Sequence, residues 1–329
     1  MIFTSKRGGN FSRNLVNFKI ADMVSVIIPC YNVETVVKRA IDSVLQQSFQ
    51  EWELILVDNN SSDNTSSVLE GYQKEYPSKI KIFVEKKKGA PAARNRGLKE
   101  AMGKWIQFLD ADDEISSGKI EGQFSIAEKN EPALVIGSYK IIKTFDGTEQ
   151  FIDKKISSDD IWLGLIRSNL GITSANLWNR DVLLSVQGWD EGLPASQEYD
   201  LMFRMLQTLP MAEFDSRCVA NVYISGLESV SRGGGKEKLQ QILDARIVLR
   251  ERIKDFLLKK QLLNPERLQY ADEFIYTQLV YHYRFLPEYV KKKLKSSKLK
   301  VSLSTKINGL WLLLKIDIKR AAKGIFSRN

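Results

Sequence analysis

The sequence predicts an α/β protein: a mainly parallel sheet flanked by helices, followed by an all-helical C-terminal extension. Short β-branched apolar runs alternate with amphipathic helical patterns between about residues 23 and 110, which is typical of βαβ units. Polar clusters follow three of these runs. From residue 236 onward the periodic segments have helical spacing only.

The first strand is expected at VSVIIP (24–29), because an uninterrupted apolar run indicates burial on both faces of a sheet. The helix expected after it, at 34–47, places Val37, Ile41 and Val44 on one face. Further strands are expected at 53–58, 79–85 and 104–110. Helices are expected between them at 64–76 and 91–102, the former with Asp63 or Asn64 near its N-cap.

Beyond residue 132 the pattern becomes mixed and then purely helical. Strands are expected near 133–139, 172–178 and 217–224, and helices near 159–168, 197–208, 236–260, 265–285 and 304–325. A Gly-rich basic loop, SRGGGK (231–236), separates the mixed part from the helical part. We therefore divide the chain into a flexible N-terminal arm (1–22), an α/β domain (23–235) and a basic helical region (236–329).

Composition limits the class of protein and its partners. The net charge of +9 favours an anionic partner, namely nucleic acid, an anionic membrane surface or a phosphorylated substrate. Nucleic acid ranks last, because no aromatic-basic pattern or nucleic-acid motif is present, and we expect no nucleic-acid partner. Cys30 and Cys218 fit neither a disulfide framework nor a zinc site, which indicates a reducing compartment. We expect no secretory signal and no membrane-spanning helix.

Three polar clusters are expected to meet at one rim of the sheet. PCYN follows the first strand, DNNSSDNT the second and DADD the fourth. In open α/β sheets the ligand binds outside the carboxyl ends of the strands. The absence of a GxGxxG motif after the first strand argues against a dinucleotide-binding dehydrogenase, and a P-loop is also absent.

The DADD cluster contains Asp110, Asp112 and Asp113 within four positions. One aspartate would suffice for a turn and helix cap, whereas three at the end of a strand favour a hard cation such as Mg²⁺ or Mn²⁺. Asp58 ends the second strand and is open to two interpretations. It either forms the turn and caps the next helix, or accepts a hydrogen bond from a base imide or ribose hydroxyl.

PASQEYDLMFRML (194–206) is the other candidate segment. One interpretation is structural: an N-cap, a Glu198 that favours the positive end of the helix, and an Asp200–Arg204 pair at i,i+4. The other makes Glu198 a general base. His282 lies in an aromatic helical segment, where packing is a better interpretation than catalysis.

The motifs VSVIIPCYN, ELILVDNNSSDNT, GAPAARNRGLKEAMGKWIQFLDADD and GWDEGLPASQEYDLMFRML together resemble glycosyltransferase family 2, the inverting nucleotide-sugar glycosyltransferases with the GT-A fold. The resemblance covers about 24–235 and implies that this segment is the catalytic domain. It implies that Pro29, Tyr31 and Asp58 border the nucleoside and that Arg94 lies near the nucleotide. It also implies that Asp110 and Asp112 bind the donor, that Asp112 and Asp113 bind the metal, and that Glu198 is the base.

Three departures from the family pattern are present. The second strand is followed by Asp58-Asn59-Asn60, where relatives usually have Asp-Asp-Gly. Gln197-Glu198 replaces the usual Glu-Asp pair at the base. The segment ISGLESVSRGG lacks the histidine that assists the metal in many members.

The expected function is therefore Mn²⁺- or Mg²⁺-dependent, inverting transfer of a sugar from a nucleotide-diphosphate sugar, UDP-linked by preference, to a hydroxyl of a glycan or lipid-linked acceptor. Such a reaction belongs to cell-surface polysaccharide biosynthesis. The alternatives are a sugar nucleotidyltransferase and a non-catalytic nucleotide-sugar-binding module. The former would show a Gly-rich, Arg-containing loop after the first strand, where PCYNVET stands.

Two expectations concern the later part of the chain. The loop at 225–236 is expected to close as a lid over the diphosphate. The helix at 305–329 has apolar residues at helical spacing and a basic end, so it either packs on the protein or lies in a membrane interface. The location is expected to be cytoplasmic, either free or peripheral on the cytoplasmic face of the inner membrane.

Overall fold

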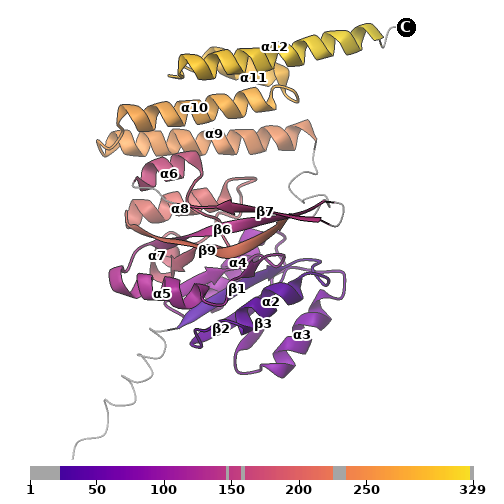
Figure 1. Ribbon diagram of the computed structural model, residues 1–329, viewed down its shortest axis with the longest axis vertical. Helices are drawn as coiled ribbons and strands as arrows, with labels where there is room; N and C mark the ends of the chain where they lie inside the picture. Colours follow the sequence, from indigo (N-terminus) through magenta and orange to yellow (C-terminus); the bar gives the residue numbers. More distant parts are fainter. Residues whose placement is uncertain (1–22, 146–147, 157–159, 225–234, 327–329) are drawn as a thin grey trace, which may run out of the picture. The chain divides into compact units, whose positions relative to one another are not determined.

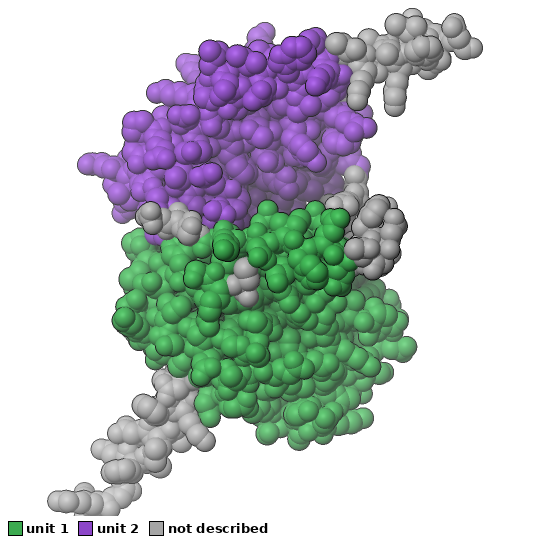
Figure 2. Space-filling model, in the orientation of Figure 1, with its two compact units in different colours: residues 1–157, 170–191, 204–226 green, residues 158–169, 192–203, 227–329 purple. Residues whose placement is uncertain are grey.

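Figure 1 shows the ribbon of a computed structural model of the chain, which describes residues 23–145, 148–156, 160–224 and 235–326. The predicted arm at 1–22 and the predicted lid, apart from its last two residues, lie outside the described residues. The chain divides into two compact units, coloured separately in Figure 2. Residues 1–157, 170–191 and 204–226 form the first unit, and residues 158–169, 192–203 and 227–329 form the second.

The described residues of the first unit form a nine-stranded sheet with strand order β3-β2-β1-β4-β8-β6-β9-β5, and β7 pairs with β6 outside this path. The first four strands in the chain are β1 (Val24–Cys30), β2 (Trp52–Asp58), β3 (Ile80–Val84) and β4 (Trp105–Phe108). They are parallel to one another, with Val24 opposite both Trp52 and Trp105. Six of the seven residues of β1 are buried, as its uninterrupted apolar run predicted, and all seven residues of β2 are buried as well.

Helices connect these parallel strands, as the alternating pattern predicted. They are α2 (Val37–Leu45), α3 (Thr65–Glu75) and α4 (Ala90–Glu100), visible in indigo to violet in Figure 1. The buried face of α2 consists of Val37, Ala40, Ile41, Ser43 and Val44. Pro91 lies in the first turn of α4, where its missing N–H costs nothing. Apolar side chains of α2 and α3 join those of the strands in one core cluster.

The second half of the sheet differs most from prediction. Its strands are β5 (Glu114–Ile115), β6 (Leu134–Phe145), β7 (Thr148–Lys154), β8 (Leu177–Asn179) and β9 (Ala212–Ile224), with helices α5 (Lys119–Asn130) and α7 (Arg180–Ser185). The strand expected at 172–178 begins only at Leu177, because Ala175 and Asn176 donate their amides to the Ile172 carbonyl and form a turn. The strand expected at 133–139 extends to Phe145, because its residues from Tyr139 onward pair with β7.

The second unit is helical. It contains α6 (Ile161–Arg167), the first residues of α8 (Gln197–Thr208), α9 (Lys236–Lys259), α10 (Pro265–His282), α11 (Pro287–Ser296) and α12 (Leu303–Phe326). Its core includes Leu243, Ile247, Ile275, Leu279, Tyr283, Leu286 and Val290. Helix α11 was not predicted. His282 is buried, in agreement with the packing interpretation, and this burial lowers its pKa.

Candidate active site

The loops that follow β1 and β2 hold each other through hydrogen bonds. The Asn32 side chain accepts from the Ser62 amide at 2.8 Å. The Glu34 amide donates to Asp63, and the Asn64 amide donates to the Glu34 carboxylate at 2.7 Å. The predicted meeting of these two polar clusters at the carboxyl edge of the parallel strands is therefore seen in the structure.

Asp58 ends β2 and is buried, with 7% of its surface exposed. Its carboxylate accepts hydrogen bonds from the Ser61 amide at 3.1 Å and from the Ser66 hydroxyl at 2.8 Å. These bonds fix the turn into α3, as the structural interpretation required. Pro29 lies in the neighbouring strand, and Tyr31 just beyond it is exposed.

The two asparagines after Asp58 explain how this chain manages without the family's usual glycine. Asn60 has φ +62°, a left-handed conformation that glycine adopts freely and asparagine tolerates better than most residues. Its side-chain amide donates to the Lys86 carbonyl at 2.7 Å. Asn59 donates to the Lys87 carbonyl and accepts from the Gly89 amide. The Asn pair therefore preserves the turn and also ties it to the loop before α4.

The acidic loop after β4 is anchored to α4 by Arg94. Arg94 is buried, and its guanidinium donates to the Asp110 carboxylate at 2.5 Å. The same guanidinium lies over the Trp189 ring, 4.6 Å from the ring centre. Sequence motifs predicted that both Arg94 and Asp110 lie near the nucleotide, and the structure brings the two side chains together.

Asp113 is the buried member of the acidic cluster. Its carboxylate accepts from the Ser174 hydroxyl at 2.6 Å, and that hydroxyl accepts from the Asp110 amide at 3.2 Å. Burial and the neighbouring Asp110 charge raise the pKa of Asp113 to about 8. Partial loss of water and the same Asp110 charge also raise the pKa of Asp112. The cluster therefore holds more negative charge than its protein neighbours compensate.

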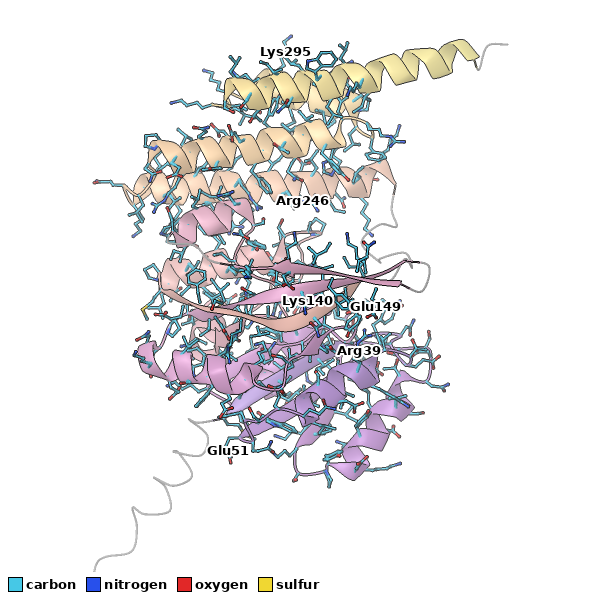
Figure 3. The ribbon with its side chains drawn as sticks, in the orientation of Figure 1. Arg39, Glu51, Lys140, Glu149, Arg246 and Lys295 are labelled. Carbon is cyan, nitrogen blue, oxygen red and sulfur yellow. The ribbon has the colours of Figure 1, made fainter. Side chains whose placement is uncertain are left out.

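A second arginine reaches the acidic loop from α2. The Arg39 guanidinium donates to the backbone carbonyl of Asp112. It also lies over the Tyr223 ring, 3.5 Å from the ring centre, and is labelled in Figure 3. On the other side of the loop the Asn221 amide donates to the Glu114 carboxylate at 2.5 Å. Helix α2 and strand β9 thus hold a loop whose carboxylates repel one another.

The donor set fits a hard cation that takes part of its coordination from a ligand. Across the described ranges, no three Asp, Glu, His or Cys side chains converge as a ready-made metal site. The Asp112 side chain is exposed beside the buried Asp113 carboxylate. Divalent cations that bind phosphate substrates commonly use one or two carboxylates and leave other positions to phosphate oxygens and water. Asp112 and Asp113 fit that arrangement, since a bound cation would favour the charged forms of both carboxylates, which burial and the Asp110 charge disfavour.

A fully buried lysine, Lys119, is linked to the acidic loop through Gln107 and Ser174. The Lys119 ammonium donates to the side-chain oxygens of Gln107 and Gln123. Gln107 in turn donates to the Ser174 carbonyl at 3.0 Å. Burial lowers the pKa of Lys119 to about 7. This hydrogen-bond network links the start of α5 to the residue that holds Asp113.

Glu198 lies in the first turn of α8 and belongs to the second unit. The preceding residue, Gln197, donates its side-chain amide to the Leu193 carbonyl at 2.7 Å. Asp200 is buried and forms an ion pair with Arg252 at 2.6 Å. Asp200 is thus engaged in a structural ion pair, and the role of Glu198 as the base stays a prediction.

Sequence reasoning missed Arg39 and Ser174. Arg39 stands on the polar face of an amphipathic helix, where a charged residue is ordinarily solvated. Ser174 lies in a short turn in sequence and carries no motif. The only local signal was for Arg39, which lies in the first turn of the helix that follows β1.

Comparison with known proteins identifies the class. Residues 25–172 match the family model described as Glycosyl transferase family 2, in agreement with the resemblance of the sequence motifs. Over 152 residues the chain is 39% identical to the Escherichia coli UDP-Glc:alpha-D-GlcNAc-diphosphoundecaprenol beta-1,3-glucosyltransferase WfgD, covering 46% of this chain and 57% of that protein. It is 36% identical over 138 residues to the Campylobacter jejuni GalNAc(5)-diNAcBac-PP-undecaprenol beta-1,3-glucosyltransferase, covering 41% of this chain and 44% of that protein. The chain thus spans about half the length of these relatives.

A solved structure supports the fold. The S. aureus TarS 1-349 structure in complex with UDP-GlcNAc resembles the chain with a TM-score of 0.60 at 17% identity. The likeness covers 89% of this chain and 81% of that one. The predicted GT-A fold, a mixed and mainly parallel sheet followed by a helical C-terminal region, is confirmed.

Proposed function

We propose that the chain is a metal-dependent inverting glycosyltransferase that moves a sugar from a UDP-sugar to a hydroxyl of a lipid-linked or glycan acceptor in cell-surface polysaccharide biosynthesis. One observation carries the proposal. The acidic loop Asp110–Asp113 lies at the carboxyl edge of the parallel strands, beside the loops of Asn32 and Asp58, and its negative charge is only partly compensated. Such an edge is where α/β sheets bind nucleotides.

The relatives and the site both support a UDP-sugar as the donor. TarS was solved with UDP and with UDP-GlcNAc, and the E. coli relative is named for UDP-Glc. In this chain Asp58, Pro29 and the exposed Tyr31 would border the nucleoside, with Asp58 held in place by two hydrogen bonds. Arg94 would contribute to nucleotide binding by positioning Asp110, because its guanidinium lies 2.5 Å from the Asp110 carboxylate.

Asp112 and Asp113 would hold Mn²⁺ or Mg²⁺. When bound, the cation neutralises the charge that develops on the leaving diphosphate. Asp113 is fixed by Ser174, and the Asp112 backbone is fixed by Arg39, so both carboxylates are presented without rearrangement of the loop. Preorganised charge of this kind lowers the barrier, because no reorganisation is needed during the reaction.

Glu198 would take the proton from the acceptor hydroxyl as that oxygen attacks the anomeric carbon. The bond to the diphosphate breaks on the opposite face, so a single displacement inverts the anomeric configuration. The lipid-linked acceptor class is suggested by the two relatives, whose names describe diphosphoundecaprenol-linked glycans. The remaining alternative is a non-catalytic module that binds a nucleotide sugar, because the same acidic cluster could bind the metal and the diphosphate without catalysing transfer.

An assay separates these alternatives. Purified protein is incubated with a panel of nucleotide sugars, with Mn²⁺, with Mg²⁺ or with EDTA, and thermal shift and donor turnover are both measured. We expect one UDP-sugar to raise the melting temperature and to be consumed only when metal is present. Stabilisation without turnover towards any hydroxyl acceptor would favour the binding module, and full turnover in EDTA would exclude the metal.

Ser174 offers a test of the geometry. Ser174→Ala removes the hydroxyl that joins Asp113 to the Asp110 amide. We expect the affinity for UDP in Mn²⁺ to fall about 10- to 100-fold, as for other residues that orient metal ligands. Unfolding should become easier by about 1–3 kcal/mol, because buried polar groups lose a partner.

Ser138→Ala is the matched control for Ser174→Ala. Ser138 is also fully buried, and its hydroxyl accepts from the Ile156 amide at 2.8 Å. The two variants should lose similar stability in thermal unfolding. Isothermal titration should show weaker UDP binding only for Ser174→Ala, and equal binding by the two variants would remove Ser174 from the site.

A further inference from the structure

The positive charge of the chain is concentrated in one segment. Residues 287–329 contain twelve Lys and Arg residues against two acidic residues. Their net charge of +10 exceeds the +9 of the whole chain, so residues 1–286 together carry −1. Seven lysines in the described part of this segment are exposed: Lys291, Lys292, Lys295 (labelled in Figure 3), Lys298, Lys300, Lys306 and Lys315.

Within residues 303–316, whose side chains the structure describes, helix α12 packs on the other helices of its unit through one face. Gly309 on that face is buried, and a Cβ there would lie 2.4 Å from the Tyr276 hydroxyl of α10. Leu313 and Ile316 pack against the core of the helical unit. The packing interpretation of this helix is therefore correct for one side of it.

The opposite face of α12 is apolar and exposed. Exposed fractions along it are 74% for Leu303, 46% for Ile307, 61% for Leu310, 60% for Trp311 and 53% for Leu314. The intervals of three and four residues place these side chains in one stripe. Solvent-exposed stripes of large side chains mark interaction surfaces rather than ordinary helix exteriors.

Two lysines border this stripe. Lys306 follows Leu303 by three positions and precedes Leu310 by four, so it lies along one edge. Lys315 follows Trp311 by four positions and lies along the other edge. An apolar centre flanked by long basic side chains is the pattern of a helix that lies in a lipid interface, where lysines extend towards the headgroups.

We propose that the exposed face of α12, from Leu303 to Leu314, docks on an anionic lipid surface with the helix parallel to the bilayer. No helix among the described residues is long and apolar enough to cross a membrane. A second copy of the chain is a poor occupant, because it would bring another segment of net charge +10 against the first. An anionic surface instead offers both the apolar layer and the opposite charge.

Flotation of the full chain with vesicles tests the proposal. We expect the protein to float with vesicles of phosphatidylglycerol and phosphatidylcholine at low salt, and much less with pure phosphatidylcholine or at high salt. Trp311→Gln/Leu314→Gln should lower the partition coefficient by more than about tenfold, because two large apolar side chains no longer enter the interface. Glutamine is a good helix former, so α12 should persist in circular dichroism.

Two matched controls keep the result specific. Val248→Gln/Leu258→Gln changes two exposed apolar residues of α9 in the same unit and should not alter flotation. Lys306→Glu/Lys315→Glu should lower partition by roughly tenfold or more, whereas Lys74→Glu/Lys99→Glu, which changes the net charge equally on exposed positions of α3 and α4, should have little effect.

Two outcomes would overturn the proposal. The first is equal flotation of wild-type protein and Trp311→Gln/Leu314→Gln, or flotation of neither. The second is found without vesicles, by analytical ultracentrifugation: a wild-type oligomer that the same variant converts to monomer would assign this face to a second copy. Donor turnover with a soluble acceptor should be unchanged in the variant, so failure here is distinct from failure of the proposed enzymatic function.

Discussion

Asp112→Asn should abolish sugar transfer while leaving the protein folded. Asp112 is an exposed residue next to Asp113 in the acidic loop, and the charge of its carboxylate is needed to hold the cation in our proposal. Loss of a ligand should reduce turnover by more than about 100-fold, since even partners that only orient metal ligands commonly contribute 10- to 100-fold. Initial rates over a Mn²⁺ titration measure the effect.

The fold should tolerate this change because the asparagine is nearly isosteric and relieves repulsion from Asp110. Asp153→Asn, an exposed change in β7, is the control and should retain full activity. Retained turnover of Asp112→Asn, together with wild-type turnover in EDTA, would contradict the assignment of the acidic cluster to a metal.

Glu198→Gln should produce the second large effect. If Glu198 is the base, turnover should fall by roughly 10²- to 10⁴-fold while UDP binding stays unchanged. Stability should barely change, because glutamine is of the same size and continues the first turn of α8. The pH profile provides a further readout, since the acidic limb that reports ionisation of the base should disappear from kcat/KM.

Glu237→Gln is the control for Glu198→Gln. Glu237 also lies in the first turn of a helix of the second unit, α9, so the variant loses the same favourable charge at a helix N-terminus. It should have normal turnover. Normal turnover of Glu198→Gln as well would transfer the role of base to Asp190 or Asp200, of which Asp200 is already held by Arg252.

The parallel half of the sheet could be predicted because its signals are local. The runs of β1, β2 and β4 each end at a polar cluster, and helical patterns follow the runs of β1, β2 and β3. The loops at Asn32, Asp58 and Asp110 could be assigned to one edge for the same reason, since the order of parallel strands brings their carboxyl ends together.

The later strands and the supports of the site depend on contacts that local patterns do not encode. β5 has two residues and exists only through its pairing with β9. Ser174 lies in a turn, and its role depends on the placement of that turn beside Asp113. Helix α11 was not predicted because its lysines interrupt the apolar spacing. Pro287 followed by Glu288 is nevertheless a signal for the start of a helix.

The hydrogen bond between Ser174 and Asp113 has a consequence for the order of folding. Ser174 and Asp113 are 61 residues apart in the chain. The hydrogen bond between Asn32 and Ser62, which joins the loops after β1 and β2, spans only 30 residues. Closing longer loops costs more chain entropy and delays contact formation. We therefore expect the loops of Asn32 and Ser62 to form first during refolding and the acidic loop to become protected later. Pulse-labelled hydrogen exchange at the amides of Ser62 and Asp110 measures this order, because each amide donates one of the hydrogen bonds in question. Protection of the Asp110 amide before the Ser62 amide would contradict late docking of the Ser174 turn.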